Sequence, residues 1–354
     1  AKRLVKFYAI VMFSSAFSNC KSEEVIDGIK IVRCGNEFTV YLLALFYYLT
    51  SFRKFIDVIV ECKDGGVPWL TQFYSTKRKI ALVHQTGRGA DTPFNQSVWY
   101  YEFSSKVFGY LVYLLEPLLL KAYRGIDIIT PSKSTRTDLE GFGIDPKHIE
   151  VAEPGVIKDV EFQIKKSRIP TIIYLGRVNR YKRLEDVIKT FAIIKKEIPS
   201  SRLIIAGLGD SEYLDYLYEI SRKMGVYEKV DFRGRVSEDE KMFLLSEAHL
   251  MLFASVREGW GISVIEANSV GTPVVGYDVP GLQDSIIDGR TGTLVRLGDV
   301  EAMANASITL LKDENGRWRA YSEEAIRWAK TFSWDRSAEK FAHVMDRHLK
   351  KNAI

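Results

Sequence analysis

The sequence predicts an α/β protein built from two Rossmann-like domains. Three observations support this class: a length of 354 residues, alternation of short β-branched runs with longer amphipathic stretches, and repetition of that alternation in both halves. A chain of this length is long for a single hydrophobic core. Continuous apolar strands separated by helices are typical of parallel sheets covered on both faces.

The second half of the chain shows the alternation most clearly. Ser237 and Glu240 form a capping box at the start of one of its helices. Strands are expected at 171–176, 202–207, 229–234, 249–255 and 273–277, with helices at 183–197, 211–224, 238–247 and 262–270.

The first half repeats the pattern less cleanly, with strands expected at 9–15, 57–62, 79–84, 127–132 and 149–156. Pro154-Gly155 and a charged run predict a linker at 154–168. We therefore expect one domain at 1–156, a second at 157–330, and a C-terminal helix within 331–354 that packs back on the first domain.

Composition excludes several classes of function. Hydrophobic residues make up 46% and charged residues 27%, as in ordinary globular proteins, and a net charge of +5 from scattered basic residues argues against nucleic-acid binding. Cys20, Cys34 and Cys62 lack C-x-x-C spacing, which predicts a reducing, cytoplasmic compartment without a disulfide framework or cysteine metal site.

Two apolar stretches, 41–49 and 109–120, are predicted to be buried helices. The first is too short to span a bilayer, and Glu116 and Pro117 interrupt the second. A face resting on a membrane is the alternative, because tyrosines and tryptophans are frequent around 98–123.

Two strand-to-helix turns carry residues suited to phosphate. Gly176 and Arg177 follow a strand, and Lys182 comes five residues after the arginine, so two cations could hold a diphosphate there. A solvated loop is the alternative reading. Gly207 and Gly209 form a second such turn, which lacks the third glycine of a dinucleotide fingerprint and is poor support for NAD.

The stretch REGWGISVIEA, 257–267, lies between a predicted strand and a predicted helix. Gly259 and Gly261 free the backbone so that amide groups and the helix N-terminus can face an anion. Glu258 would stand at the edge of the cleft and Glu266 one turn into the helix, where carboxylates accept hydrogen bonds from sugar hydroxyls. A nucleotide sugar offers both kinds of group, whereas a capping loop is the structural alternative.

Several segments agree in order and spacing with one enzyme family. They are LGRVNRYKR (175–183), IIAGLGD (204–210), VDFRGRV (230–236), EGWGISVIEA (258–267), GTPVVGYDVPGLQDSI (271–286) and FSWDRSA (332–338). The spacing resembles the E-(seven residues)-E motif of retaining glycosyltransferases with the GT-B fold, glycosyl transferases group 1.

The resemblance implies transfer of a hexose from a UDP-sugar or GDP-sugar with retention at the anomeric carbon and without a metal. Arg177 and Lys182 would neutralise the donor diphosphate. Glu258 would hold donor-sugar hydroxyls, Glu266 would accept from the ribose, and His84 would point at the donor sugar. The backbone beside the sugar would come from Gly259, Trp260, Gly261 and Ile262, and the base would be bordered by Arg233, Gly234 and Val236.

The resemblance also predicts one departure. The family begins with a strand, a Gly-rich loop and a helix, whereas AKRLVKFYAIVMFSS resembles the end of that helix followed by the second strand. We expect about 25 residues, one β–loop–α unit, to be absent, which would leave a gap in the first sheet. The alternatives are therefore a catalytically inactive sugar-nucleotide-binding protein or subunit, and a UDP-sugar epimerase. The acceptor would be a glycan or lipid-linked.

Overall fold

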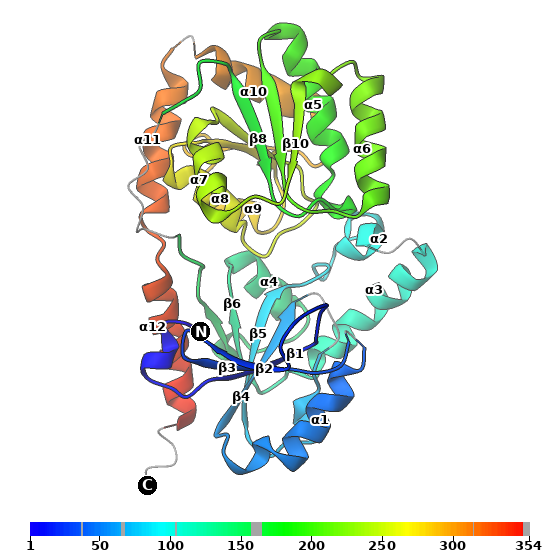
Figure 1. Cartoon of the computed structure of the whole chain (residues 1–354), viewed down its shortest axis with the longest axis vertical. Helices are drawn as coiled ribbons and strands as arrows, with labels where there is room; N and C mark the ends of the chain where they lie inside the picture. The colour runs from blue at the N-terminus through cyan, green and yellow to red at the C-terminus, as the bar shows by residue number, and fades with distance from the viewer. Residues whose placement is uncertain (37, 65–67, 103–104, 157–164, 314, 350–354) are drawn as a thin grey trace.

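The computed structural model describes residues 1–349 except 37, 65–67, 103–104, 157–164 and 314. Two α/β domains lie one above the other, and the chain passes from the lower to the upper one and returns (Figure 1). Of the predicted linker, residues 157–164 lie outside the described part.

The second domain is a six-stranded parallel sheet in the order β10-β9-β8-β11-β12-β13. Five of its strands confirm the predictions, and β13 was not predicted. The strands are β8 (Thr171–Leu175), β9 (Arg202–Ala206), β10 (Val230–Gly234), β11 (Leu250–Phe253), β12 (Val274–Tyr277) and β13 (Gly292–Val295).

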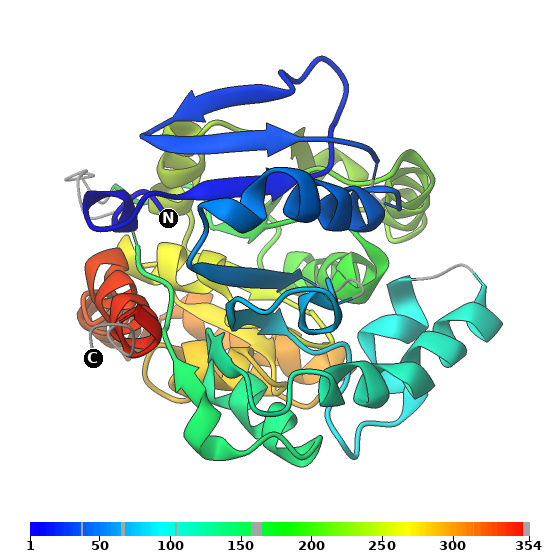
Figure 2. The same ribbon diagram turned by 90° about the horizontal axis from the view of Figure 1, so that it is seen from below.

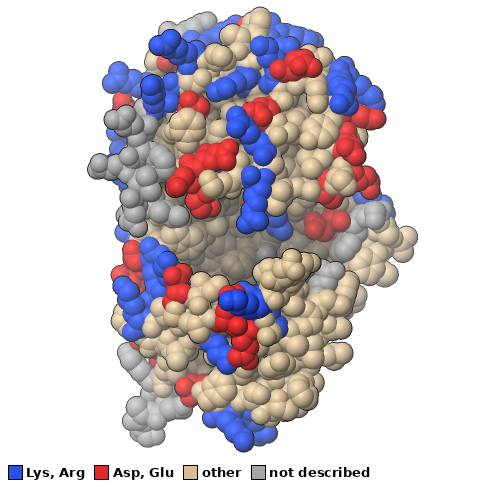
Figure 3. Space-filling model, in the orientation of Figure 1, with Lys and Arg blue, Asp and Glu red and all other residues tan. Residues whose placement is uncertain are grey.

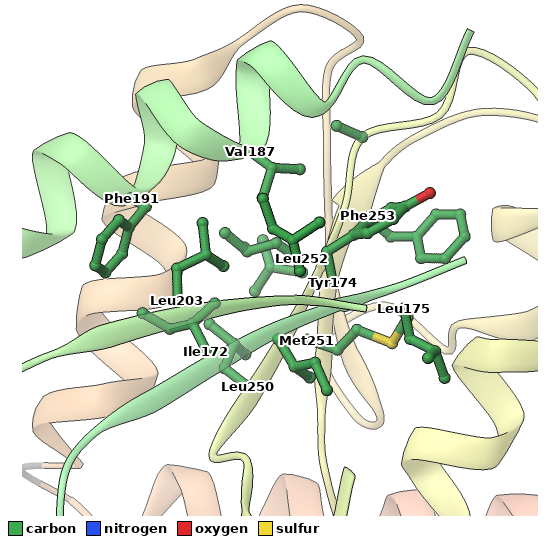
Figure 4. Packing of buried hydrophobic residues seen from close by; sticks show 14 of the residues in the cluster. Ile172, Tyr174, Leu175, Val187, Phe191, Leu203, Leu250, Met251, Leu252 and Phe253 are labelled. Atoms are coloured by element: carbon green, nitrogen blue, oxygen red, sulfur yellow. The ribbon is translucent and has the colours of Figure 1, made fainter. Parts of the chain in front are cut away.

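Helices cover both faces of this sheet, so its central strands are buried throughout. Phe191 from a covering helix and Leu203 and Met251 from the strands are completely buried, and Figure 4 shows them among the core side chains that lie on the two sides of the strands. The helices are α5 (Leu184–Glu197), α6 (Ser211–Lys223), α7 (Glu238–Glu247), α8 (Ile262–Ser269), α9 (Leu282–Ser285), α10 (Val300–Lys312) and α11 (Arg317–Ala329).

The first domain contains two sheets among its described residues. One is parallel, in the order β4 (Val58–Asp64), β5 (Arg78–Gln85), β6 (Asp127–Thr130) and β7 (Ile149–Val151). The other has the order β1 (Val11–Ser14), β3 (Ile29–Arg33) and β2 (Glu23–Ile26), and its strands lie apart from β4 in Figure 2. The β2–β3 hairpin was not predicted, although Asp27 and Gly28 both adopt the positive φ of a tight turn.

The helices of the first domain are α1 (Val40–Thr50), α2 (Val98–Glu102), α3 (Lys106–Lys121) and α4 (Lys133–Gly141). Residues 41–49 and 109–120 are helical as predicted, but the prediction that they are buried is wrong. In α1 only Val40 and Tyr48 are buried, and in α3 only Gly109, Glu116 and Leu120 are buried while most of the leucines are exposed or half-exposed. Among the described helices, none is long and apolar enough to cross a membrane.

The C-terminal helix α12 (Trp334–Leu349) packs back on the first domain, as predicted. Val344 is completely buried in a cluster with Ile80 and Ile129, and Lys340 Nζ donates a 2.9 Å hydrogen bond to the Val151 carbonyl. The return crossing is bonded to the outgoing one, because Val156 and Ser333 form a parallel bridge.

Candidate functional site

The strand ends of both domains meet at a hollow between them, which Figure 3 shows as a shaded recess across the middle of the molecule. Parallel sheets bind ligands beyond the carboxyl ends of their strands. Three loops reach this region: 86–92 after β5, 176–182 after β8 and 254–261 after β11.

A buried ion pair joins two of these loops. Lys182 ends a one-turn 3-10 helix after β8, and its Nζ donates a hydrogen bond to Glu258 Oε1. Only 8% of the lysine side chain and 11% of the glutamate side chain are exposed. Burial of such a pair adds little stability because desolvation offsets the attraction. The pair is therefore a poor explanation of the fold and a good candidate for ligand binding.

Arg177 supplies a second, exposed cation beside this pair. Its Nη2 donates to the Tyr181 hydroxyl at 3.3 Å, while its carbonyl oxygen accepts from the Tyr174 hydroxyl at 2.7 Å. Glu102 of α2 faces the same cations: burial raises the pKa of its carboxyl, and Arg177 and Lys182 oppose that rise. Sequence reasoning missed Glu102 because nothing in its neighbourhood marks it.

The glycines of the second turn pack against the first. A Cβ on Gly207 would lie 1.7 Å from the Gly176 carbonyl oxygen, and one on Gly209 would lie 2.4 Å from the Val178 carbonyl oxygen. Close approach of two backbone segments therefore accounts for both glycines, whatever ligand lies beyond them.

The predicted base-side residues lie at the end of β10. Arg233 is exposed, and its Nε donates to Asp231 Oδ2 at 2.6 Å. Gly234 accepts a 2.8 Å hydrogen bond from the Gly207 amide, which connects this segment to the glycine turns. Val236 is half-buried against the core.

Gly259 lies where the two domains touch. A Cβ at this position would be 2.2 Å from the His84 carbonyl oxygen, at the end of β5. The His84 side chain is exposed beside this contact. The structure thus brings His84, Glu258 and Lys182 to one part of the interdomain surface.

The rest of the loop turns the chain into α8. Gly261 has φ of 96° and precedes Ile262, whose side chain is 42% exposed. Trp260 points away into an apolar cluster and packs on Phe332, with ring centroids 5.0 Å apart. Its ring is therefore placed for packing, so only its backbone is available to a ligand in the recess.

Glu266 has a cation of its own. Lys241 Nζ lies 2.7 Å from Glu266 Oε1 and also 2.7 Å from Glu238 Oε2. Burial raises the pKa of Glu266, and Lys241 opposes the rise. The two glutamates of the motif therefore have separate partners and do not share a proton.

A buried network crosses between the domains next to Glu258. Arg257 Nη1 donates to Asp138 Oδ2, which also accepts from the Thr86 hydroxyl at 2.6 Å. Burial raises the pKa of Asp138, and Arg257 opposes that rise. Sequence reasoning missed this network because Asp138 lies 119 residues from Arg257 and 52 residues from Thr86.

Within the described residues, no group of three or more His, Cys, Asp or Glu side chains is arranged to hold a metal ion. Arg177 and Lys182 are the cations beside Glu258 that the sequence predicted for a diphosphate.

Comparison with known proteins assigns the second domain. The family model described as "Glycosyl transferases group 1" matches residues 157–328. D-inositol 3-phosphate glycosyltransferase from Mycobacterium bovis is 31% identical over 227 residues, covering 60% of this chain and 46% of the relative. A protein of the same name from Mycobacterium tuberculosis matches equally. The chain thus spans about half the length of these curated relatives.

Solved structures extend the likeness to the whole chain. Sucrose-phosphate synthase from Thermosynechococcus elongatus has a TM-score of 0.79 at 18% identity, covering 99% of this chain and 91% of that one. HepE from Anabaena, solved with UDP-glucose, has a TM-score of 0.69 at 15% identity and covers 91% and 86%. These neighbours have the GT-B fold. Residues 157–328 are therefore similar to the glycosyl transferases group 1 family, and the whole chain has the GT-B fold.

Proposed function

We propose that this protein transfers a hexose from a UDP-sugar or GDP-sugar to an acceptor, with retention of anomeric configuration and without a metal. The observation that carries the proposal is the buried Lys182–Glu258 pair at the recess where the strand ends meet. It places a cation suited to phosphate beside a carboxylate suited to sugar hydroxyls, and a structural neighbour was solved with UDP-glucose.

In this proposal the bound donor replaces the contact between the two members of the ion pair. Lys182 turns from Glu258 to the diphosphate, joined by Arg177, and Glu258 becomes free to accept from a sugar hydroxyl. Negative charge grows on the leaving diphosphate as the glycosidic bond breaks through an oxocarbenium-like transition state. The two cations therefore act where charge develops, which is where stabilisation accelerates a reaction most.

The other site residues complete the donor pocket. Glu266 takes the ribose hydroxyls, 233–236 borders the base, and the His84 side chain faces the sugar from the first domain. The backbone of 259–262 lies beside the sugar. Retention is supported by the E-(seven residues)-E spacing.

The test is donor turnover by matched variants. Lys182→Ala and Glu258→Ala should each lower transfer from the preferred donor by about 100-fold or more, as loss of a transition-state contact does. Lys312→Ala and Glu197→Ala form the control, because they break an exposed Lys–Glu pair of 3.3 Å elsewhere in the same domain. Turnover by Lys182→Ala equal to that of the controls would refute the proposal.

Two further measurements test the chemistry. Activity should persist in EDTA, and the product examined by NMR should keep the donor's anomeric configuration. Inverted product would contradict retention while leaving the transferase assignment intact.

One observation favours a second candidate, a sugar-nucleotide-binding protein without transfer. The acceptor-side domain has two separate sheets among its described residues, because β1 and β4 pair with no common strand. Thermal stabilisation by UDP or GDP, with no release of sugar to any of several acceptors, would establish binding alone.

We also propose a cytoplasmic enzyme that works beside a membrane on a glycan or lipid-linked acceptor. Support comes from three free cysteines and from the outward-facing apolar helices of the first domain.

A further inference from the structure

Helix α3 of the first domain is inverted relative to an ordinary surface helix. Its one carboxylate, Glu116, is 2% exposed, whereas Val107 is 74% and Leu118 is 61% exposed. Surface helices normally turn their apolar stripe inward and their charges outward. In α3 both the buried carboxylate and the exposed apolar side chains therefore need an explanation.

The inner face is fixed by hydrogen bonds. Glu116 Oε1 accepts from the Gly87 amide at 2.7 Å, and Oε2 accepts from Trp99 Nε1 at 2.7 Å. Lys63 Nζ lies 3.6 Å from the same carboxylate. Both carboxylate oxygens of Glu116 are thus hydrogen-bonded inside the domain, and Leu120 is buried on the same side. The helix cannot roll its exposed leucines inward without breaking these contacts.

The outer face is a continuous apolar stripe, which we call the α3 apolar face: Val107, Phe108, Leu111, Leu114, Leu115 and Leu118. Each of these side chains is between 47% and 74% exposed. At about 100° per residue the six lie within one third of the helix circumference, and Glu116 is about 180° from Val107. An exposed patch of this kind marks an interaction surface.

The exposed charges of α3 itself have one sign. The only charged residues of α3 are Lys106, Glu116 and Lys121, and the glutamate is buried. Arg124 follows, also exposed. The two lysines stand at opposite ends of the helix, so the apolar face is framed by cations and carries no exposed carboxylate.

We propose that the α3 apolar face docks on an anionic lipid surface, with the helix lying in the plane of the interface. An apolar stripe flanked by lysines is the arrangement that enters the boundary between acyl chains and anionic headgroups. Figure 3 shows a broad uncharged area over this lower right part of the molecule, beside the recess. Docking there would hold the recess next to the membrane. This inference rests on the membrane-side location proposed above, and it adds the surface and the lipid charge.

The test is cosedimentation with phosphatidylcholine vesicles, with and without phosphatidylglycerol, in the absence of donor. Wild-type protein should sediment with the anionic vesicles, and Leu114→Gln with Leu118→Gln should lower the partition coefficient by about tenfold or more. Lys106→Gln with Lys121→Gln should remove the preference for anionic vesicles. High salt should have the same effect.

The control replaces two exposed apolar residues of the second domain, Phe243→Gln with Ile169→Gln, which are 54% and 45% exposed. This variant should bind vesicles as wild type does. Wild-type protein that stays in the supernatant, or an α3 variant that sediments equally, overturns the proposal. So does a dimer in solution that the α3 variant converts to monomer, because the occupant would then be a second copy.

Transfer to a soluble acceptor, assayed in parallel, separates this inference from the proposed function. Loss of vesicle binding with normal transfer contradicts only the docking surface. Vesicle binding without transfer contradicts only the enzymatic assignment.

Discussion

Gly259 is a residue whose identity follows from the contact between the domains. The His84 carbonyl oxygen occupies the space that a side chain would need, so the first domain can reach Glu258 only if residue 259 lacks a Cβ. A glycine in a motif is commonly explained by phosphate binding, but here packing is sufficient.

Gly259→Ala should therefore separate the domains at the site and lower transfer by about 100-fold, because small displacements of reacting groups are costly in rate. Nucleotide affinity should change much less, since in the proposed function the second domain carries the nucleotide side of the site. Comparison of turnover with nucleotide titration measures the difference. Gly289→Asn is the control, because Gly289 has φ of 72° and nothing within 4 Å. Normal turnover by Gly259→Ala would contradict this explanation.

His249, which lies outside the recess, makes the stability of the fold depend on pH. Its Nδ1 accepts a 3.2 Å hydrogen bond from the Thr171 amide, and burial, with Lys166 and Arg202, lowers its pKa from 6.5 to about 4. The unfolded chain takes up the proton first as pH falls. The contribution of neutral His249 to the free energy of unfolding is therefore fully present above pH 6.5. It is lost progressively as the pH falls to about 4.

Denaturant unfolding should show this loss, at no more than about 1.4 kcal/mol per pH unit for one proton, less what solvent screening removes. His249→Asn keeps an acceptor near the same position and does not titrate, so its free energy of unfolding should fall less over this range. Identical pH profiles for the variant and wild type would contradict the assignment.

At the scale of elements, sequence pattern was most informative where a strand is buried on both faces. All five predicted strands of the second domain are present because a continuous apolar run has few alternatives between two layers of helices. The β2–β3 hairpin was missed because Glu23, Glu24 and Lys30 make it look like a surface loop.

The orientation of a helix was harder to predict than its existence. Residues 109–120 are helical as predicted, yet composition alone could not show that Glu116 would find three partners inside and turn the leucines outward. The orientation of the helix depends on residues that are distant from it in sequence.

Docking of α12 depends on Gly155. A Cβ there would lie 2.0 Å from the Trp334 backbone nitrogen, where the chain re-enters the first domain. Gly155→Ala should lower the free energy of unfolding by about 1–3 kcal/mol, as overpacking of backbone does, and expose α12 to proteolysis.

Urea unfolding and limited proteolysis measure both effects. Gly298→Asn is the comparison, since Gly298 has φ of 83° and open space around it. A Gly155→Ala protein as stable and as protease-resistant as this control would show that α12 does not depend on the close approach.

For the whole molecule, the contact between domains is the part that sequence could not supply. Chain order places the ends of β5, β8 and β11 at one recess and so predicts which loops carry the site. It does not predict that Arg257 reaches Asp138, or that Ser134 of α4 donates its amide to Asp284 of α9.

Asp138→Asn should weaken the closed arrangement. The substitution keeps the size of the side chain but leaves Arg257, 4% exposed, without its counterion, and breaking such a pair costs about 3–5 kcal/mol. Small-angle scattering should show a larger radius of gyration, and turnover should fall.

Asp145→Asn is the matched control, because Asp145 lies in the same domain and its pair with Lys147 is 70% and 49% exposed. A radius of gyration equal to that of the control would mean that Arg257–Asp138 does not hold the domains together.

The bridge between Val156 and Ser333 bonds the two crossings of the chain to each other at one point. Val156 and Phe332 share an apolar cluster with Trp260. A turn of one domain on the other must move Phe332 against that indole, and through Gly259 and Gly261 the displacement reaches Glu258 and the start of α8. We therefore expect a change in the angle between the domains to change the geometry of the loop that carries Glu258.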